Sequence, residues 1–135
     1  MRRRQEGWVV SWFVVTAPLL LVFLGLVLDG GVLLLRSQML DAASDAAALA
    51  ATDAWDRDYW KQNGKVRIDP AGAESLARQY LARNMPDARV MEVRVSPSNR
   101  VHVRTQLTVP FFFMRIVGFT STPVDSYSTA VRRNN

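Results

Sequence analysis

The sequence contains no cysteine and a single histidine, His102, among its 135 residues. The lack of cysteine excludes disulfide bonds, thiol nucleophiles and cysteine-based zinc sites, and one histidine excludes sites built from several. A chain of this length holds one small domain at most, so a multidomain enzyme is excluded too. We therefore expect no catalytic residues, no cofactor and no metal.

Charge is also absent from one long stretch, residues 8–28. At about 1.5 Å per residue, a helix of this length matches a hydrocarbon core of ~30 Å. Arg2, Arg3 and Arg4 precede it, and such a basic flank favours the cytoplasmic side. The sequence predicts a cytoplasmic leader over 1–7, one transmembrane helix over 8–28, and a remainder outside the cytoplasm.

A cleaved secretory signal is the alternative interpretation of this segment. Such signals have a shorter apolar stretch, closely followed by a small-x-small cleavage site. The nearest good candidate, Ala48-Leu49-Ala50, lies 20 residues beyond Leu28. We therefore expect the helix to remain as an anchor.

Two residues of the apolar region interrupt its pattern. Pro18 removes a backbone donor and predicts a kink that a membrane helix tolerates. Asp29 follows the stretch directly, and two interpretations remain open for it. It lies either at the outer headgroup level, where water solvates it, or at membrane depth, where it pairs with a partner or lines a hydrated seam.

Residues 29–60 are predicted to extend the helix, because they are rich in alanine and contain no glycine or proline between Arg36 and Gly64. Small side chains share one face of this extension. The face consists of Leu40, Ala43, Ala47, Ala50, Ala51 and Ala54. It suits either helix packing in an assembly or packing on the chain's own sheet. Candidate packing or partner contacts are Pro18, Asp29, Ala43, Ala47, Ala50 and Ala54.

Residues 61–135 read as a small α+β domain that begins with a connection and a helix. The stretch 62–70 contains glycine and proline and predicts the connection. Asp69 is placed to cap a helix that starts at Pro70 and ends near Asn84. Its apolar side would be supplied by Leu76, Tyr80 and Leu81.

Two strands with one polar face each are expected next, at 91–95 and 101–109, with their odd-numbered residues inward. A three-residue loop that pairs Ser96 with Arg100 keeps both apolar sets on one side. Asn99 then takes the left-handed conformation. The same register places Glu92 opposite Arg104.

The chain is expected to close with an apolar connection and a last strand. Residues 111–119, FFFMRIVGF, predict a short helix or turn that seals the sheet edge, or alternatively touches the bilayer surface. Residues 122–132 predict the strand, with Tyr127 and Val131 on one face. The predicted fold is α+β: a long N-terminal helix, then about three antiparallel strands with a packed helix.

Charged residues give little sign of chemistry or nucleic-acid binding. Residues 61–135 carry 12 basic and five acidic side chains, but the basic ones are mostly single arginines, so nucleic acid is not an expected partner. The aspartates of 41–58 lack the glycine and glutamate of a calcium loop. No spacing brings two of the distal carboxylates together. These are Glu74, Asp87, Glu92 and Asp125.

Several segments resemble one family. The segments are Gly7-WVVSW-Phe13, Pro18-LLL, LDGG at 28–31, the alanine-rich run from Leu40, and VPFFFMRIVGF before a Thr/Ser-rich strand. Together they resemble the TadE/TadG-like pilus-assembly proteins of tight-adherence (Flp-type) pili. The resemblance implies a minor pilin, pseudopilin or anchored assembly subunit of a pilus or related secretion machine in the bacterial cytoplasmic membrane. The expected partners are the bilayer and other pilin-like membrane proteins, in an oligomer or hetero-complex.

The resemblance also bears on processing. In family members matured like pilins, a peptidase cuts after a glycine that is followed five residues later by glutamate. Here the bond would be Gly7–Trp8, and Trp12 stands at the position of the glutamate. The chain is thus more similar to members that keep an uncleaved anchor. A membrane-anchored binding or sensor module is the alternative function.

Overall fold

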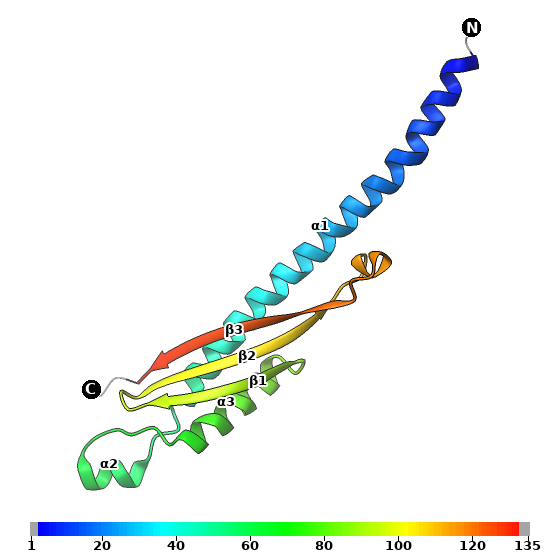
Figure 1. Ribbon diagram of the computed structural model, residues 1–135. Helices are drawn as coiled ribbons and strands as arrows, with labels where there is room; N and C mark the ends of the chain where they lie inside the picture. Colours follow the sequence, from blue (N-terminus) through cyan, green and yellow to red (C-terminus); the bar gives the residue numbers. More distant parts are fainter. Residues whose placement is uncertain (1–2, 133–135) are drawn as a thin grey trace. The chain divides into compact units, whose positions relative to one another are not determined.

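The structure, a computed structural model, describes residues 3–132, with side chains from Gly7 onward (Figure 1). A long helix is followed by two shorter helices and by a sheet of three strands in the order β1-β2-β3. The elements are α1 (Arg3–Ala51), α2 (Arg57–Asn63), α3 (Pro70–Asn84), β1 (Ala88–Ser96), β2 (Arg100–Pro110), the 3-10 helix η1 (Met114–Val117) and β3 (Ser121–Val131). This arrangement confirms the predicted α+β fold.

The described chain divides into two compact units. One combines the residues up to Leu34 with the segment from Pro110 to Ser121, and the other combines 35–109 with the residues from Thr122 onward. The first unit is called the apolar unit and the second the α+β unit below. Helix α1 and strands β2 and β3 contribute residues to both.

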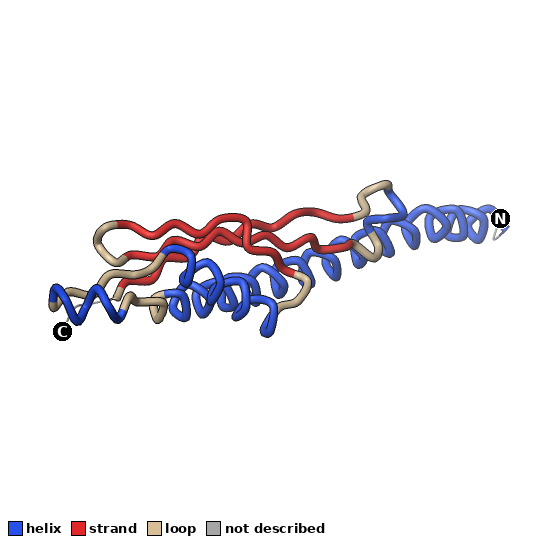
Figure 2. Tube along the Cα trace, turned by 90° about the horizontal axis from the view of Figure 1, so that it is seen from below, coloured by secondary structure: helices blue, strands red, loops and turns tan. Residues whose placement is uncertain are grey.

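The core of the α+β unit lies between its helices and one face of the sheet, with α3 and the C-terminal part of α1 on the same side (Figure 2). Most buried helix residues are small, which lets the backbones approach the sheet closely. The buried helix residues include Leu40, Ala47, Ala48 and Ala51 of α1 and Ala73, Ala77 and Leu81 of α3. From the sheet, β2 contributes Val101, Val103, Leu107 and Val109. The alanine-rich face of α1 therefore packs within its own unit.

This packing differs in detail from the predicted helix faces. Ala47 is fully buried, whereas Ala43, Ala50 and Ala54 are only half-buried. On α3, Tyr80 is 39% exposed, and the alanines of that helix occupy the buried side instead. Leu40 and Leu81 are buried as predicted. Alanine adds little hydrophobic signal to a sequence pattern, so the pattern of larger residues did not identify Ala73 and Ala77 as core residues.

A buried hydroxyl pair joins α1 to the sheet. Ser44 and Thr105 are fully buried and share a hydrogen bond, and the Ser44 hydroxyl also lies 2.6 Å from the Leu40 carbonyl. We expect Ser44→Ala to lower the free energy of unfolding by about 1–3 kcal/mol, because the Thr105 hydroxyl is left buried without its partner. Thr105→Val leaves Ser44 its carbonyl acceptor and should cost less.

Chemical denaturation of the detergent-solubilised protein measures both effects. The exposed loop residue Ser98, changed to alanine, is the matched control and should leave unfolding unchanged. Equal costs for Ser44→Ala and Ser98→Ala would contradict the importance of the buried pair.

The β1–β2 hairpin confirms the predicted loop and most of the register. Ser96 pairs with Arg100, Glu92 pairs with Arg104, and Asn99 has φ 54°. A bulge between Val90 and Glu92 then shifts the register by one residue. Met91, predicted to face inward, is therefore 50% exposed, and Val90 is buried in its place.

Strand β3 places Tyr127 and Val131 on one face, as predicted, and this face is the exposed one. Tyr127 is 72% exposed and Val131 is 48% exposed, whereas Ser126 and Ser128 are buried. Strand alternation permits only one of the two sets to point inward. The small hydroxyl residues occupy the inner face, and hydrophobicity alone does not identify them.

Helix α1 ends at Ala51, so the helical extension predicted as far as residue 60 was wrong. The Thr52 hydroxyl donates back to the Leu49 carbonyl, and Arg132 donates to the Thr52 carbonyl at 3.1 Å. Asp56 then starts α2 by accepting hydrogen bonds from the backbone N–H groups of Asp58 and Tyr59. Such capping competes with continued helix even where helix propensity is high.

The Asp56 cap predicts a pH dependence. The backbone N–H of Tyr59 is the main cause of a lowered Asp56 pKa, and Arg67 also stabilises the carboxylate. Because the folded pKa lies below the usual value, the cap stabilises α2 above that value and is lost as the pH falls through the lowered pKa. The Trp60 indole NMR signal should report this transition, and Asp56→Asn should remove it.

Candidate membrane and assembly interface

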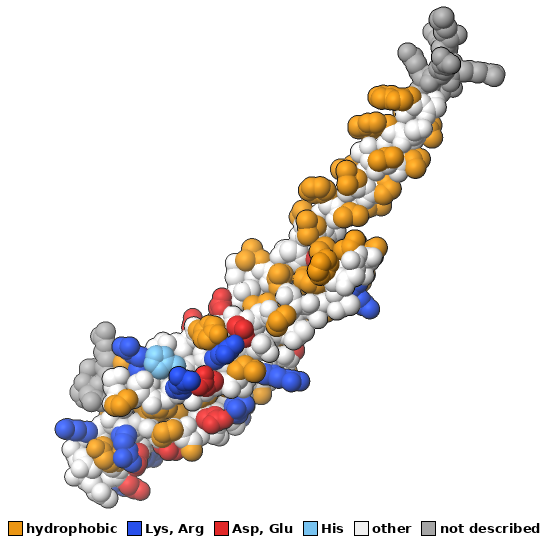
Figure 3. All heavy atoms as spheres, viewed as in Figure 1, with side chains coloured by type: hydrophobic (Ala, Val, Ile, Leu, Met, Phe, Trp, Pro, Cys, Tyr) orange, Lys and Arg blue, Asp and Glu red, His pale blue; other side chains and the backbone are white. Residues whose placement is uncertain are grey.

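The first part of α1 carries its apolar side chains outward on all sides. Trp8, Phe13 and Phe23 are each more than 60% exposed. Hydrophobic side chains line the N-terminal part of α1 in Figure 3. The helix is long and apolar enough to cross a membrane. A helix that is apolar all round and uncovered by protein needs an apolar environment, which a bilayer supplies.

Asp29 is buried although it follows the apolar run directly. Its side chain is 5% exposed and accepts three backbone hydrogen bonds, from Phe112 at 3.0 Å, Phe113 at 2.9 Å and Met114 at 2.7 Å. Successive N–H groups that converge on one carboxylate form an anion-binding nest. Backbone N–H groups, and not water, therefore surround the Asp29 carboxylate, which contradicts the interpretation that water solvates it. Its depth in a membrane stays a prediction.

Gly25, one turn before Asp29, allows the same segment to approach α1. A Cβ atom at this position would lie 2.6 Å from Phe113 Cβ and 3.0 Å from its Cγ. Gly30 and Gly31 of the same helix have nothing within 4 Å of such an atom. Gly25 is thus the glycine of α1 that the contact with Phe113 requires.

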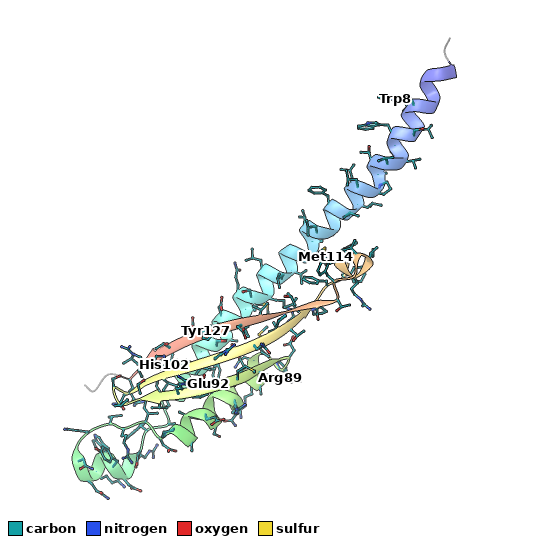
Figure 4. All side chains as sticks on the ribbon, viewed as in Figure 1. Trp8, Arg89, Glu92, His102, Met114 and Tyr127 are labelled. Atoms are coloured by element: carbon teal, nitrogen blue, oxygen red, sulfur yellow. The ribbon has the colours of Figure 1, made fainter. Side chains whose placement is uncertain are left out.

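Residues 111–119, called the hairpin tip below, connect β2 to β3 and contain the predicted short helix, η1. The tip belongs to the apolar unit together with the first part of α1. That it seals the sheet edge stays a prediction. Met114 lies in this segment beside α1 (Figure 4). An apolar hollow of about 340 Å³ between helix and tip is lined by Pro18, Leu21, Val22, Met114, Ile116 and Val117, among others.

Sequence reasoning singled out Asp29 and Pro18 but missed Gly25 and the partners of all three. An acid at the end of an apolar run was the available signal. Its acceptor role involves residues more than 80 positions away, and a single sequence gives no indication of such a pairing.

Comparison with known families assigns the chain. The model of the Tad-like Flp pilus-assembly family matches residues 35–130, which is most of the chain. The chain belongs to this family. A second family model, TadE-like protein, matches residues 7–49 and so includes most of α1. Neither the curated proteins nor the solved structures gave a match.

The two matches confirm the predicted resemblance and meet on the C-terminal half of α1, where they overlap over 35–49. For this Tad-family protein, the N-terminal match begins at Gly7, next to the candidate processing bond Gly7–Trp8. That bond lies inside α1, and Trp12 is exposed on the same helix. Processing there stays a prediction. Arg2 and the side chains of Arg3 and Arg4 lie outside the described residues.

The outer face of the sheet in this Tad-family protein is polar. Glu92, His102 and Tyr127 come from β1, β2 and β3 (Figure 4), and His102 Nδ1 lies 2.9 Å from the Thr129 hydroxyl. Arg104 pairs with Asp125 at 3.5 Å. Over the part of the chain that the structure describes, no group of three or more metal-ligating side chains is found.

The four distal carboxylates considered for catalysis each have an arginine partner. The pairs are Glu74–Arg78, Asp87–Arg36, Glu92–Arg94 and Asp125–Arg104. All four pairs are substantially exposed, so they are ordinary surface ion pairs that contribute little to stability.

Proposed function

We propose that this Tad-family protein is a non-catalytic subunit of minor-pilin or pseudopilin type. Residues 8–28 would hold it in the cytoplasmic membrane, with the N-terminus in the cytoplasm and the α+β unit outside. Membership of a pilus-assembly family supports the process. The exposed apolar part of α1 supports the anchor.

The observation that carries this proposal is the double use of α1. One continuous helix supplies both the exposed apolar segment and buried core residues of the α+β unit, namely Leu40, Ser44 and Ala47. Cleavage at Ala48–Ala50, as for a secretory signal, would remove these residues from the core. The cost of their loss supports retention of the anchor.

A sensor or binding module would need a ligand-sized pocket in residues 65–135. The hollows there are open surface depressions. One lies beside His102 and Arg104 on the sheet, and another lies between Arg67 and Pro97. Neither of these two hollows encloses a ligand-sized space, so neither favours this alternative over the assembly role.

Deletion of the gene tests the role in assembly. We expect a clean deletion to lower the number of surface filaments counted by electron microscopy, and the full-length gene to restore them. Detergent extraction and pull-down should recover other pilus-assembly membrane proteins. Normal piliation in the deletion strain would contradict the proposal.

One complementing variant separates the anchor from the pilus role. A chain that starts at Asp29 behind a cleavable export signal should fail to restore filaments, because it lacks the membrane segment. If it restores them, the protein serves the pilus without an anchor.

Intact mass of the membrane-extracted protein tests processing. We expect no cut at Gly7–Trp8, and a product that begins at Trp8 would show pilin-type maturation.

A further inference from the structure

We infer that the hairpin tip, residues 111–119, is a second membrane-inserted element, embedded in the lipid leaflet nearer Asp29. This inference rests on the proposed anchoring of α1 in the bilayer. It adds a contact between the tip and lipid to the anchoring by α1. The tip is too short to be a membrane-spanning helix.

The depth of the tip follows from its contacts with α1. Ile116 and Val117 share a hollow with Pro18, Leu21 and Val22. Pro18 lies 11 residues before Asp29, or about 16 Å along the helix axis. That distance is roughly half of a ~30 Å hydrocarbon core. A segment in contact with these helix residues must therefore lie at hydrocarbon depth when residues 8–28 span the bilayer.

Most backbone N–H groups of the tip have hydrogen-bond acceptors within the protein, as a lipid environment requires. Irregular backbone is costly in lipid because its N–H groups find no water. In the tip, Asp29 accepts the N–H groups of Phe112, Phe113 and Met114. The N–H groups of Phe111, Ile116, Gly118 and Phe119 bond to backbone carbonyls of residues 113–120. The carboxylate thus satisfies the donors that the short 3-10 helix cannot.

The exposure of the tip side chains also supports insertion into lipid. Four apolar residues are strongly exposed: Phe112 at 77%, Ile116 at 83%, Val117 at 53% and Phe119 at 61%. Four such residues in one nine-residue segment are unusual for a surface in contact with water. Arg115 is the one charged residue of the segment. Its long side chain can extend to the lipid phosphates while its stem stays in the apolar region.

Lipid, and not a protein partner, is the occupant that the structure favours. The exposed tip residues add to the apolar surface of α1, whose side chains are exposed outside its contact with the tip (Figure 3). The hollow is lined almost wholly by apolar side chains and offers no polar group to orient a specific partner. Acyl chains fill such a surface without directional contacts.

The absence of cysteine makes a direct depth measurement possible. Single variants Ile116→Cys, Phe13→Cys and Thr129→Cys of the full chain are labelled with a fluorophore and reconstituted in phosphatidylethanolamine–phosphatidylglycerol vesicles. Quenching is measured with nitroxides placed on the acyl chain and with aqueous iodide. All three positions are exposed, so the changes leave the packing intact.

We expect the Ile116 label to resemble the Phe13 label, with strong acyl-chain quenching and at least about fivefold weaker iodide quenching than the Thr129 label. Iodide quenching of Ile116 equal to that of Thr129, with Phe13 protected, would overturn the inference while the anchor stands. Iodide access to Phe13 would overturn the anchor itself.

Dilution of the protein in lipid distinguishes coverage of the tip by lipid from coverage by a second copy of the chain. The protection of the Ile116 label should be unchanged when the ratio of lipid to protein is raised. Protection that disappears on dilution would mean that the tip is covered by another copy of the chain, and it would overturn the assignment to lipid.

Discussion

Replacing Gly25 by alanine is expected to push the hairpin tip away from α1. The new methyl group would lie 2.6 Å from Phe113 Cβ, and rotation of the Phe113 side chain cannot move its own Cβ. Overpacking of this kind typically costs about 1–3 kcal/mol, which corresponds to a shift of roughly 5- to 150-fold in the docking equilibrium.

Thiol cross-linking measures this docking. Leu21 and Ile116 line the same hollow. In a chain that carries Leu21→Cys and Ile116→Cys with Gly25 intact, a short bifunctional thiol reagent should join the two cysteines. The yield should fall sharply when Gly25→Ala is added. Gly30→Ala is the matched control, because the same methyl group meets open space one to two turns further along the helix. Equal yields for the two glycine variants would show that the tip does not rest on Gly25.

Replacing Asp29 by alanine is expected to release the backbone of the tip. Three N–H groups lose their acceptor at once, and a donor left unpaired at a buried site is costly. Amide hydrogen exchange of residues 112–114 in detergent should accelerate by about tenfold or more, the scale expected for loss of charge-assisted hydrogen bonds. Asp29→Asn keeps one acceptor oxygen, so its exchange rate should lie between those of the parent chain and Asp29→Ala.

Asp45→Asn gives the control for Asp29, since Asp45 is an exposed aspartate on the same helix. Its substitution should leave the exchange of residues 112–114 unchanged. If Asp29→Ala left that exchange unchanged as well, the carboxylate would not hold the tip. In the piliation assay, Asp29→Ala should lower filament number more than Asp45→Asn if the docked tip is needed for assembly.

Local signals determined much of this protein. The uncharged run 8–28 identified the candidate membrane segment, and Asp69 with Pro70 fixed the start of α3. The turn residues 97–99 set the hairpin loop, including the left-handed Asn99. These features depend on a few neighbouring residues, whose conformational preferences act before any tertiary contact forms.

Features that depend on distant residues were decided by tertiary structure alone. The bulge beside Met91, the inward face of β3 and the end of α1 at Ala51 all follow from packing or capping that overrides the local pattern. Asp29 shows the reason most clearly. Its charge and position beside the apolar run were visible in the sequence, but its partners are backbone N–H groups, which every non-proline residue has, so only the fold could select those of residues 112–114.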